Sequence, residues 1–421
     1  MAIHSSFGGG ITRVLALGGA GSVGRYTVPK LAASDSVSEI AIAGRNLETV
    51  KATAAELGER CTAIQVDILN ETMLASIAAD YDIIVNTAGP EYKVVLPALR
   101  AAIKAGVNYC DICCHGSTTE QALTLDAAAK AADVTALMGI GVEGLSNLMM
   151  MHASKQLDKT EDLRYCIVNV IAAVGGDPET VVAQYRKSNK TDASMQLVMR
   201  SVAGKVPAYR DGCWIDVDPI EDAVRVTSPF GGEFTAHPVN ISDTITLPRA
   251  LPDVRSVSVV LSMYPQELNK VWCELGRYVA RGELDESAAA IAFMEHMATL
   301  PKEVLATPKG YEAAWVTWAE ALGTKDGKQV CYKCWPSVDW TTTSGPLAAA
   351  ALKILRGEIR TRGVLSPESC LDPMSFFAEA AQYGVQEPLN GRLLDESFEV
   401  LDKGWRQANP TRLLFEHESS P

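Results

Sequence analysis

Short apolar runs alternate with longer stretches of helical periodicity between Thr12 and about Met150. The apolar runs predict buried strands at Val14–Leu17, Ile40–Ala43, Thr62–Val66, Ile83–Asn86, Tyr109–Ile112 and Thr135–Met138. The stretches between them predict helices at Tyr26–Ala33, Leu47–Leu57, Glu71–Ala79, Val94–Ala105 and Glu120–Ala132. Strands that alternate with helices through short turns assemble into a parallel sheet, so the pattern predicts a doubly wound α/β fold.

The pattern changes after the sixth apolar run, where the strand and helix alternation ends. A strand is expected at Leu163–Val174, a helix at Glu179–Ala203 and a region rich in Pro, Gly and β-branched residues at Gly212–Leu247. Two later strand-like runs, Trp315–Thr324 and Lys328–Trp335, flank an Asp-Gly pair, which predicts a β-hairpin. These features predict a second domain of mixed α+β type.

Helical periodicity returns in the last part of the chain. Helices are expected at Leu347–Leu355 and Met374–Tyr383, and the Pro, Gly and Asp residues of Gly363–Pro373 predict a loop between them. We therefore expect an α/β domain over residues 1–147, an α+β domain over residues 148–343 and C-terminal helices over residues 344–421.

Composition and charge exclude several classes of protein. Of the 421 residues, 47% are hydrophobic and 21% are charged, which is typical of a folded globular chain. The formal net charge of -13 repels a phosphate backbone, so nucleic acid is not an expected partner. No apolar run approaches the ~20 residues of a spanning helix, and the first residues lack the features of a secretory signal. A soluble cytoplasmic protein is expected.

The ten cysteines are scattered through predicted strands, which is typical of reduced, buried thiols. Two pairs, Cys110-x-x-Cys113 and Cys331-x-x-Cys334, have the spacing of zinc ligands. Positions three apart on a strand point to opposite faces, and the second pair lies in the predicted hairpin. We therefore expect no metal site.

A glycine-rich turn follows the first predicted strand and opens the first predicted helix. It consists of Gly18, Gly19, Ala20, Gly21, Ser22, Val23 and Gly24. Glycines allow the backbone to approach a pyrophosphate closely, and the helix N-terminus supplies free N–H groups and the positive end of its dipole. Because Gly19, Gly21 and Gly24 match the three fingerprint positions, the turn predicts dinucleotide binding, with a structural turn as the alternative.

The end of the second predicted strand indicates which dinucleotide is bound. An Asp or Glu at this place accepts hydrogen bonds from the ribose of NAD, but this chain has Arg45 and Asn46 there. A guanidinium pairs with the 2′-phosphate of NADP, so NADP is favoured, while a solvated Arg45 is the alternative. The adenine is expected near Asp67 and Ile68. The nicotinamide ribose is expected near the turn that follows the fourth strand, which contains Thr87, Ala88, Gly89 and Pro90.

Five segments together resemble the saccharopine dehydrogenase-like family, which includes saccharopine reductase, carboxynorspermidine synthase and lysine 6-dehydrogenase. These segments are Gly18–Gly24, Ala43–Asn46, Val85–Pro90, Gly106–Asp111 and Gly144–Leu148. A weaker similarity is found at Gly357–Ile359 and Gly363–Glu368. The motifs are dense only in the first third of the chain.

The resemblance implies a Rossmann-type NADP domain, a central sheet that shapes the substrate pocket and C-terminal helices that fold back on the first domain. It also implies a homodimer and hydride transfer at an amine or imine centre of an amino acid or polyamine-like substrate. The chain departs from the usual family pattern at Val142–Gly144 and Cys113–Gly116. Both segments lie where a substrate is expected, so the familiar substrates are left open.

Four residues are candidates to hold the substrate or to move a proton. Asp111, after the fifth strand, faces the nicotinamide end of the groove or caps a turn. Tyr92 is a proton relay or a packing residue, and His115 is a titrating or an exposed residue. Glu143 binds a cationic nitrogen or is a solvated loop residue. Weaker candidates to clamp a substrate carboxylate are Arg186 and Arg210.

Three functions are compatible with this sequence. The first is an NADP-dependent oxidoreductase acting at CH–NH or C=N groups, in which the cofactor carries the hydride and the protein supplies orientation. The second is a reductase of a C=C or C=O bond in a biosynthetic pathway. The third is a regulator that senses NADP without turnover.

Overall fold

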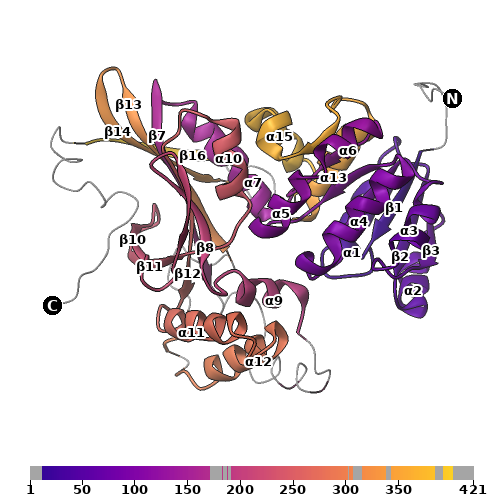
Figure 1. Ribbon diagram of the computed structural model, residues 1–421, viewed down its shortest axis with the longest axis horizontal. Helices are drawn as coiled ribbons and strands as arrows, with labels where there is room; N and C mark the ends of the chain where they lie inside the picture. The colour runs from indigo at the N-terminus through magenta and orange to yellow at the C-terminus, as the bar shows by residue number, and fades with distance from the viewer. Residues whose placement is uncertain are drawn as a thin grey trace. The chain divides into compact units, whose positions relative to one another are not determined.

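The chain divides into two compact units, which Figure 1 displays in a computed structural model. The structure describes residues 12–170, 183, 187, 191–301, 303–306, 315–337, 343–384 and 392–401, without the side chains of residues 142–144. The first unit contains Met1–Cys114, Thr118–Leu145 and Val338–Pro388, and the second contains His115–Ser117, Ser146–Ser337 and Leu389–Pro421. The functional division predicted at residues 147 and 343 stays a prediction.

The first unit is built on a seven-stranded sheet in which every strand pair is parallel. The strands, in the order β15-β6-β5-β4-β1-β2-β3, are Gly363–Leu365, Thr135–Leu137, Asn108–Asp111, Ile83–Asn86, Arg13–Leu17, Glu39–Gly44 and Cys61–Gln65. The predicted doubly wound parallel sheet is confirmed. Strand order reverses between β1 and β4, and ligands of such sheets bind at this switch point, outside the carboxyl ends of the strands.

Helices cover both faces of this sheet. The helices that pack in the first unit are α1 (Gly24–Ala32), α2 (Leu47–Leu57), α3 (Glu71–Ala78), α4 (Glu91–Ala105), α5 (Gly116–Leu123), α6 (Asp126–Ala131), α13 (Ser344–Leu355), α14 (Pro367–Cys370) and α15 (Pro373–Ala381). Leu74 of α3 and Leu99 of α4 join Leu15 and Leu17 of β1 in one fully buried core. The late helix α13 packs on α1 and β5, so a distant part of the sequence completes the unit.

Two sequence predictions for this unit are wrong in detail. The loop predicted at Gly363–Pro373 begins with strand β15, whose Gly363 N–H donates to Val134 O at 2.8 Å. A strand of three residues is too short to show a hydrophobic periodicity, and its partner β6 lies far away in the sequence, so the local pattern does not predict it. The helix predicted at Glu120–Ala132 is two helices, because the chain turns at Thr124, whose hydroxyl donates to Gln121 O at 2.6 Å.

The second unit is built on a mixed nine-stranded sheet. Its strands are β7 (Lys159–Val170), β8 (Val206–Arg210), β9 (Cys213–Val217), β10 (Val224–Thr227), β11 (Glu233–Pro238), β12 (Ser256–Tyr264), β13 (Trp315–Lys325), β14 (Lys328–Pro336) and β16 (Leu394–Val400). Only the β12–β7 pair is parallel among the strand pairs that are described. The predicted hairpin is confirmed as β13 and β14, which turn at Asp326 and Gly327.

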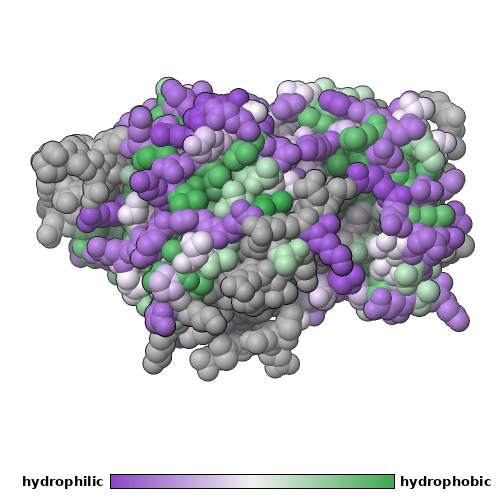
Figure 2. Space-filling model, turned by 90° about the horizontal axis from the view of Figure 1, so that it is seen from below, coloured by the Kyte–Doolittle hydropathy of each residue, from purple (hydrophilic) through white to green (hydrophobic). Residues whose placement is uncertain are grey.

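Among the helices whose bounds the structure describes, four accompany this sheet, and a further one begins in the first unit and ends in the second. They are α9 (Ala193–Arg200), α10 (Asp243–Ala250), α11 (Leu268–Ala280), α12 (Glu286–Met297) and α7 (Val142–Ser154). Within the helix predicted at Glu179–Ala203, the structure describes Ala183 and Lys187 as helical and the later part as α9, and the other residues from 179 to 190 lie outside the described residues. Among the helices that the structure describes, none is long and apolar enough to cross a membrane. Hydrophilic residues are spread over the face shown in Figure 2, with smaller hydrophobic groups between them.

Candidate functional site

The loop between β1 and α1 presents backbone N–H groups at the start of a helix. The N–H of Gly21 donates to the carbonyl of Gly18 at 2.8 Å, which folds the loop back on itself. No acceptor in the described part of the chain receives the N–H groups of Ala20, Ser22 and Val23. Open N–H groups at a helix N-terminus are donors for phosphate oxygens. The predicted diphosphate loop therefore has the donors that this ligand requires.

A close approach between this loop and α1 explains the last glycine of the motif. A Cβ atom at Gly24 would lie 2.3 Å from the carbonyl oxygen of Gly18 and 2.5 Å from the Cα of Gly19. Since these neighbours are backbone atoms, any larger residue would push the helix away from the loop. The glycine at this position thus allows the first turn of α1 to lie directly against the loop.

Arg45 lies at the carboxyl end of β2 with an exposed side chain. Its guanidinium makes no ion pair or hydrogen bond with the residues that the structure describes, so it is available to a ligand. Its neighbour Asn46 caps α2, because Asn46 Oδ1 accepts the N–H of Thr49 at 3.1 Å. A side chain of the neighbouring strand holds this turn, since Gln65 Nε2 donates to the backbone oxygen of Arg45 at 3.0 Å.

The other predicted cofactor residues lie at the carboxyl ends of β3 and β4. Asp67 is exposed and its Oδ1 accepts the N–H of Leu69 at 3.1 Å, while Ile68 is buried. The N–H of Thr87 donates to Leu17 O at 2.9 Å, which fixes the turn after β4 against β1. This turn continues through Ala88, Gly89 and Pro90, all of them partly exposed. The predicted segments therefore line the same edge of the parallel sheet.

Asp111 is fully enclosed at the carboxyl end of β5. Its Oδ1 accepts the N–H groups of Cys113 and Gly139 at 3.0 and 2.9 Å, and its Oδ2 accepts the hydroxyl of Tyr109 at 2.8 Å. Burial raises the pKa of Asp111 to about 6, although these three hydrogen bonds act to lower it. The carboxyl thus ties the ends of β5 and β6 together, and it titrates close to neutral pH.

The sequence reasoning missed Glu91, a buried carboxylate at the first position of α4. Its Oε2 accepts the N–H of Cys114 at 2.8 Å, which links the turn after β4 to the segment after β5. A carboxylate in the first turn of a helix also interacts favourably with the helix dipole. The Gly89-Pro90 turn directly before a helix, with an acidic residue at its first position, was the available signal.

The remaining candidates lie in different surroundings. Tyr92, in the first turn of α4, has a partly exposed ring that lies 5.4 Å from Lys93 Nζ. His115 is buried in the second unit and pairs with Ile241. Glu143 lies in the first turn of α7, but its side chain is outside the described residues, as is Arg186. Arg210 is engaged by Asp222, with 3.5 Å between Nη2 and Oδ1.

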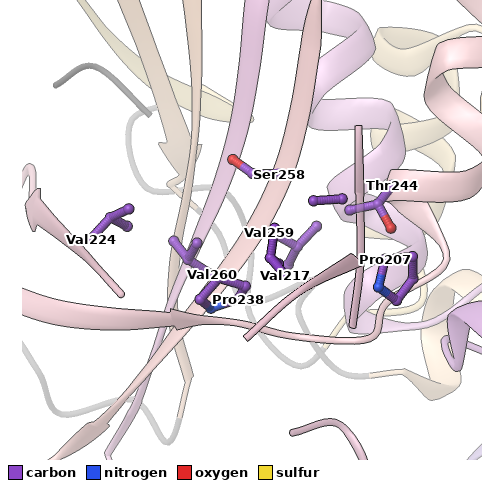
Figure 3. Close-up of a pocket in the computed structure, with 9 residues that line it drawn as sticks. Pro207, Val217, Val224, Pro238, Thr244, Ser258, Val259 and Val260 are labelled. Atoms are coloured by element: carbon purple, nitrogen blue, oxygen red, sulfur yellow. The ribbon is translucent and has the colours of Figure 1, made fainter. Parts of the chain in front are cut away.

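The second unit also contains a small pocket. It lies beside β12, where that strand changes its partner from β8 to β11, and Figure 3 shows its mainly apolar lining. Its polar side chains are Thr244 and Ser258. No group of three or more His, Cys, Asp and Glu side chains is placed to hold a metal ion in the parts described. All ten cysteines are free thiols.

Residues 14–137 match a family model described as the saccharopine dehydrogenase NADP-binding domain. The carboxyaminopropylagmatine dehydrogenase of Synechocystis sp. is 20% identical over 399 residues, which cover 89% of this chain and 97% of the relative. The trans-acting enoyl reductase of Mycobacterium bovis is 31% identical over 102 residues, or 24% of each chain.

A solved structure, the apo saccharopine dehydrogenase (L-Glu forming) from Saccharomyces cerevisiae, shares the fold. Its TM-score is 0.60 at 17% sequence identity, and the match covers 92% of this chain and 100% of that one. The relatives named here are dehydrogenases and reductases. The match of residues 14–137 to this family model confirms the resemblance inferred from the sequence.

Proposed function

We propose that this protein is an NADP-dependent oxidoreductase that acts at a CH–NH or C=N group of an amino acid or polyamine-like substrate. The observation that carries the proposal is the open row of N–H groups at Ala20, Ser22 and Val23, with the unengaged guanidinium of Arg45 at the same edge of the sheet. The resemblance to carboxyaminopropylagmatine dehydrogenase along most of both chains supports the amine class of substrate.

Each part of the proposed cofactor has residues to hold it. The loop from Gly18 to Gly24 binds the diphosphate, Arg45 pairs with the 2′-phosphate, and Asn46, Asp67 and Ile68 border the adenosine. The turn Thr87–Pro90 borders the nicotinamide ribose. The bound nicotinamide accepts or delivers the hydride. Asp111, Tyr92, Glu143 and His115 are the proposed residues that orient the substrate and manage its proton.

The role of Arg45 gives the sharpest test of this proposal. The change Arg45→Ala removes a charged hydrogen bond, which contributes about 1.5–3 kcal/mol, so NADPH affinity should fall roughly 10- to 150-fold. NADH affinity should change little, because NADH has no 2′-phosphate. Calorimetric titration of both cofactors measures the two losses. Lys51→Ala, on the exposed side of α2, is the matched control, and equal losses for NADPH and NADH would reject the role of Arg45.

The substrate class is tested by following the absorbance of reduced nicotinamide. Purified protein with NADPH is supplied with mixtures of a primary amine and an aldehyde or 2-oxo acid, and, in a parallel series, with enoyl compounds. Turnover of the amine mixtures alone supports the proposal. Turnover of the enoyl compounds alone favours the second candidate, a C=C reductase, which the enoyl reductase match over 102 residues supports. Tight NADPH binding without any turnover would point to the regulator.

Two further properties belong to this proposal. The ten free thiols suit a reducing compartment such as the cytoplasm. A homodimer is the proposed assembly, and light scattering of the purified protein measures it.

A further inference from the structure

Residues His115–Ser117 belong to the second unit although the residues on both sides of them belong to the first. Their backbone is attached to the segment between β11 and α10. His115 forms an antiparallel bridge with Ile241, and the N–H of Gly116 donates to Asn240 O at 3.3 Å. The second unit therefore determines the conformation of this short segment, which includes the catalytic candidate His115.

The side chain of Asn240 contacts two of these residues and packs against the third. Its Oδ1 accepts the N–H of Ser117 at 3.2 Å, and its Nδ2 donates to Ser117 Oγ at 2.9 Å. Asn240 Nδ2 also lies 3.5 Å from His115 Nε2. A Cβ atom at Gly116 would lie only 2.5 Å from Asn240 Oδ1, so this close packing requires glycine. The side-chain amide of Asn240 thus holds the segment His115–Ser117 at the start of α5.

The surroundings of His115 keep its imidazole neutral. Burial, together with the positive charge of Arg200, lowers the pKa of His115 to about 4, and Glu286 opposes this shift only in part. Arg200 on α9 and Glu286 on α12 form an ion pair with 3.3 Å between Nη1 and Oε1. In the tautomer with Nε2 unprotonated, Asn240 Nδ2 donates to it and favours the neutral ring as well, because a protonated ring nitrogen cannot accept a hydrogen bond.

We propose that Asn240 is a positioning residue that holds His115 in place as a neutral imidazole for the reaction. This inference rests on the proposed function, in which the substrate carries an amine. A cationic imidazolium would repel a positively charged amine, whereas a neutral ring does not. Asn240 would then act through His115, the side chain that it contacts, and not as a catalytic residue itself.

The test compares Asn240→Asp and Asn240→Ala with the wild type. A carboxylate beside Nε2 favours the imidazolium, so NMR titration should show the pKa of His115 raised by at least one unit in Asn240→Asp. The kcat of this variant relative to that of the wild type should then fall as the pH falls through the raised value. In Asn240→Ala we expect kcat to fall at least tenfold with an unchanged KM for NADPH.

Asn70→Asp is the matched control, because it adds the same charge at the N-cap of α3, where either residue caps the helix. Its kcat and its His115 titration should equal those of the wild type. An unchanged His115 pKa in Asn240→Asp would overturn the positioning claim, even if no substrate is ever turned over. A shifted His115 pKa with a wild-type kcat profile would show that the neutral ring does not matter for turnover. Failure of every amine mixture with the wild type would instead reject the proposed function.

Discussion

Asp111 and Glu320 are both almost completely enclosed, yet their pKa values move in opposite directions. Burial raises the pKa of Asp111 to about 6, and its partners are two backbone N–H groups and one hydroxyl. Burial also acts to raise the pKa of Glu320, but the charges of Arg164 and Lys333 lower it to about 2. The difference teaches that the partners of a buried carboxylate, and not its depth, decide its charge.

The two sites differ in geometry as well as in charge. Glu320 on β13 accepts two hydrogen bonds from Arg164 on β7 at 2.7 and 3.0 Å, and one from Trp318 at 2.9 Å. Lys333 Nζ, on β14, lies 2.9 Å from Glu320 Oε1. These residues are neighbours in strand register, so the sheet itself assembles the ion pairs. Asp111 lies instead at a strand end, where its partners are two backbone N–H groups and a hydroxyl and not a charged side chain.

The largest expected effect follows from removing the cation beside Glu320. Arg164→Met leaves a buried carboxylate with Lys333 as its remaining cation, so the free energy of unfolding should fall by about 3–5 kcal/mol. Urea denaturation at neutral pH measures this loss. The control Arg281→Met breaks the exposed pair with Glu283 and should lower the same quantity far less, because solvent screens an exposed ion pair. Similar losses of unfolding free energy in both variants would show that a buried carboxylate does not depend more strongly on its cationic partner than an exposed one.

The next effect depends on pH and concerns Asp111. Its pKa is higher in the folded than in the unfolded protein, so its contribution to stability is complete below about pH 4 and is lost as the pH rises through about 6. The difference of about two pKa units between the folded and the unfolded protein corresponds to about 3 kcal/mol of unfolding free energy. The asparagine of the variant Asp111→Asn cannot ionise. The unfolding free energy of the wild type, minus that of the variant, should therefore fall by that amount as the pH rises from 4 to 7.

Activity provides a second measurement on the same variant. Asp111→Asn should lower kcat and leave NADPH affinity nearly unchanged, because the residue lies beside the proposed nicotinamide end and not at the diphosphate loop. Steady-state kinetics and calorimetry separate the two quantities. Full turnover would remove Asp111 from the chemistry, and a difference in unfolding free energy that does not vary with pH would contradict the raised pKa.

The smallest effect concerns Glu91, a buried carboxylate that holds one backbone N–H. Glu91→Ala leaves the N–H of Cys114 without this acceptor, which should lower the unfolding free energy by about 1–3 kcal/mol. Glu91→Gln keeps an acceptor oxygen and serves as the control, with a loss at the low end of that range or below it. Thermal unfolding of both variants measures the difference. Equal losses would show that the charge matters more than the hydrogen bond.

Local sequence patterns predicted the elements whose signal lies within a few residues. The glycine turn, Arg45 and the Asp-Gly hairpin each depend on backbone conformation and near neighbours, and the predicted parallel sheet followed from the strand and helix alternation. Strand β15 could not be predicted in this way, because three residues carry no period and their partner Thr135 is more than two hundred residues away.

The sequence alone determined the fold class of the first unit and the nucleotide-binding motif, since periodicity and glycine placement are properties of contiguous residues. Only the tertiary structure decided which side chains meet. It enclosed Asp111 with Tyr109, set Glu91 against Cys114 and placed Asn240 beside His115. These contacts join residues from separate strands and loops, and their pKa values depend on burial and neighbouring charge, which no local pattern specifies.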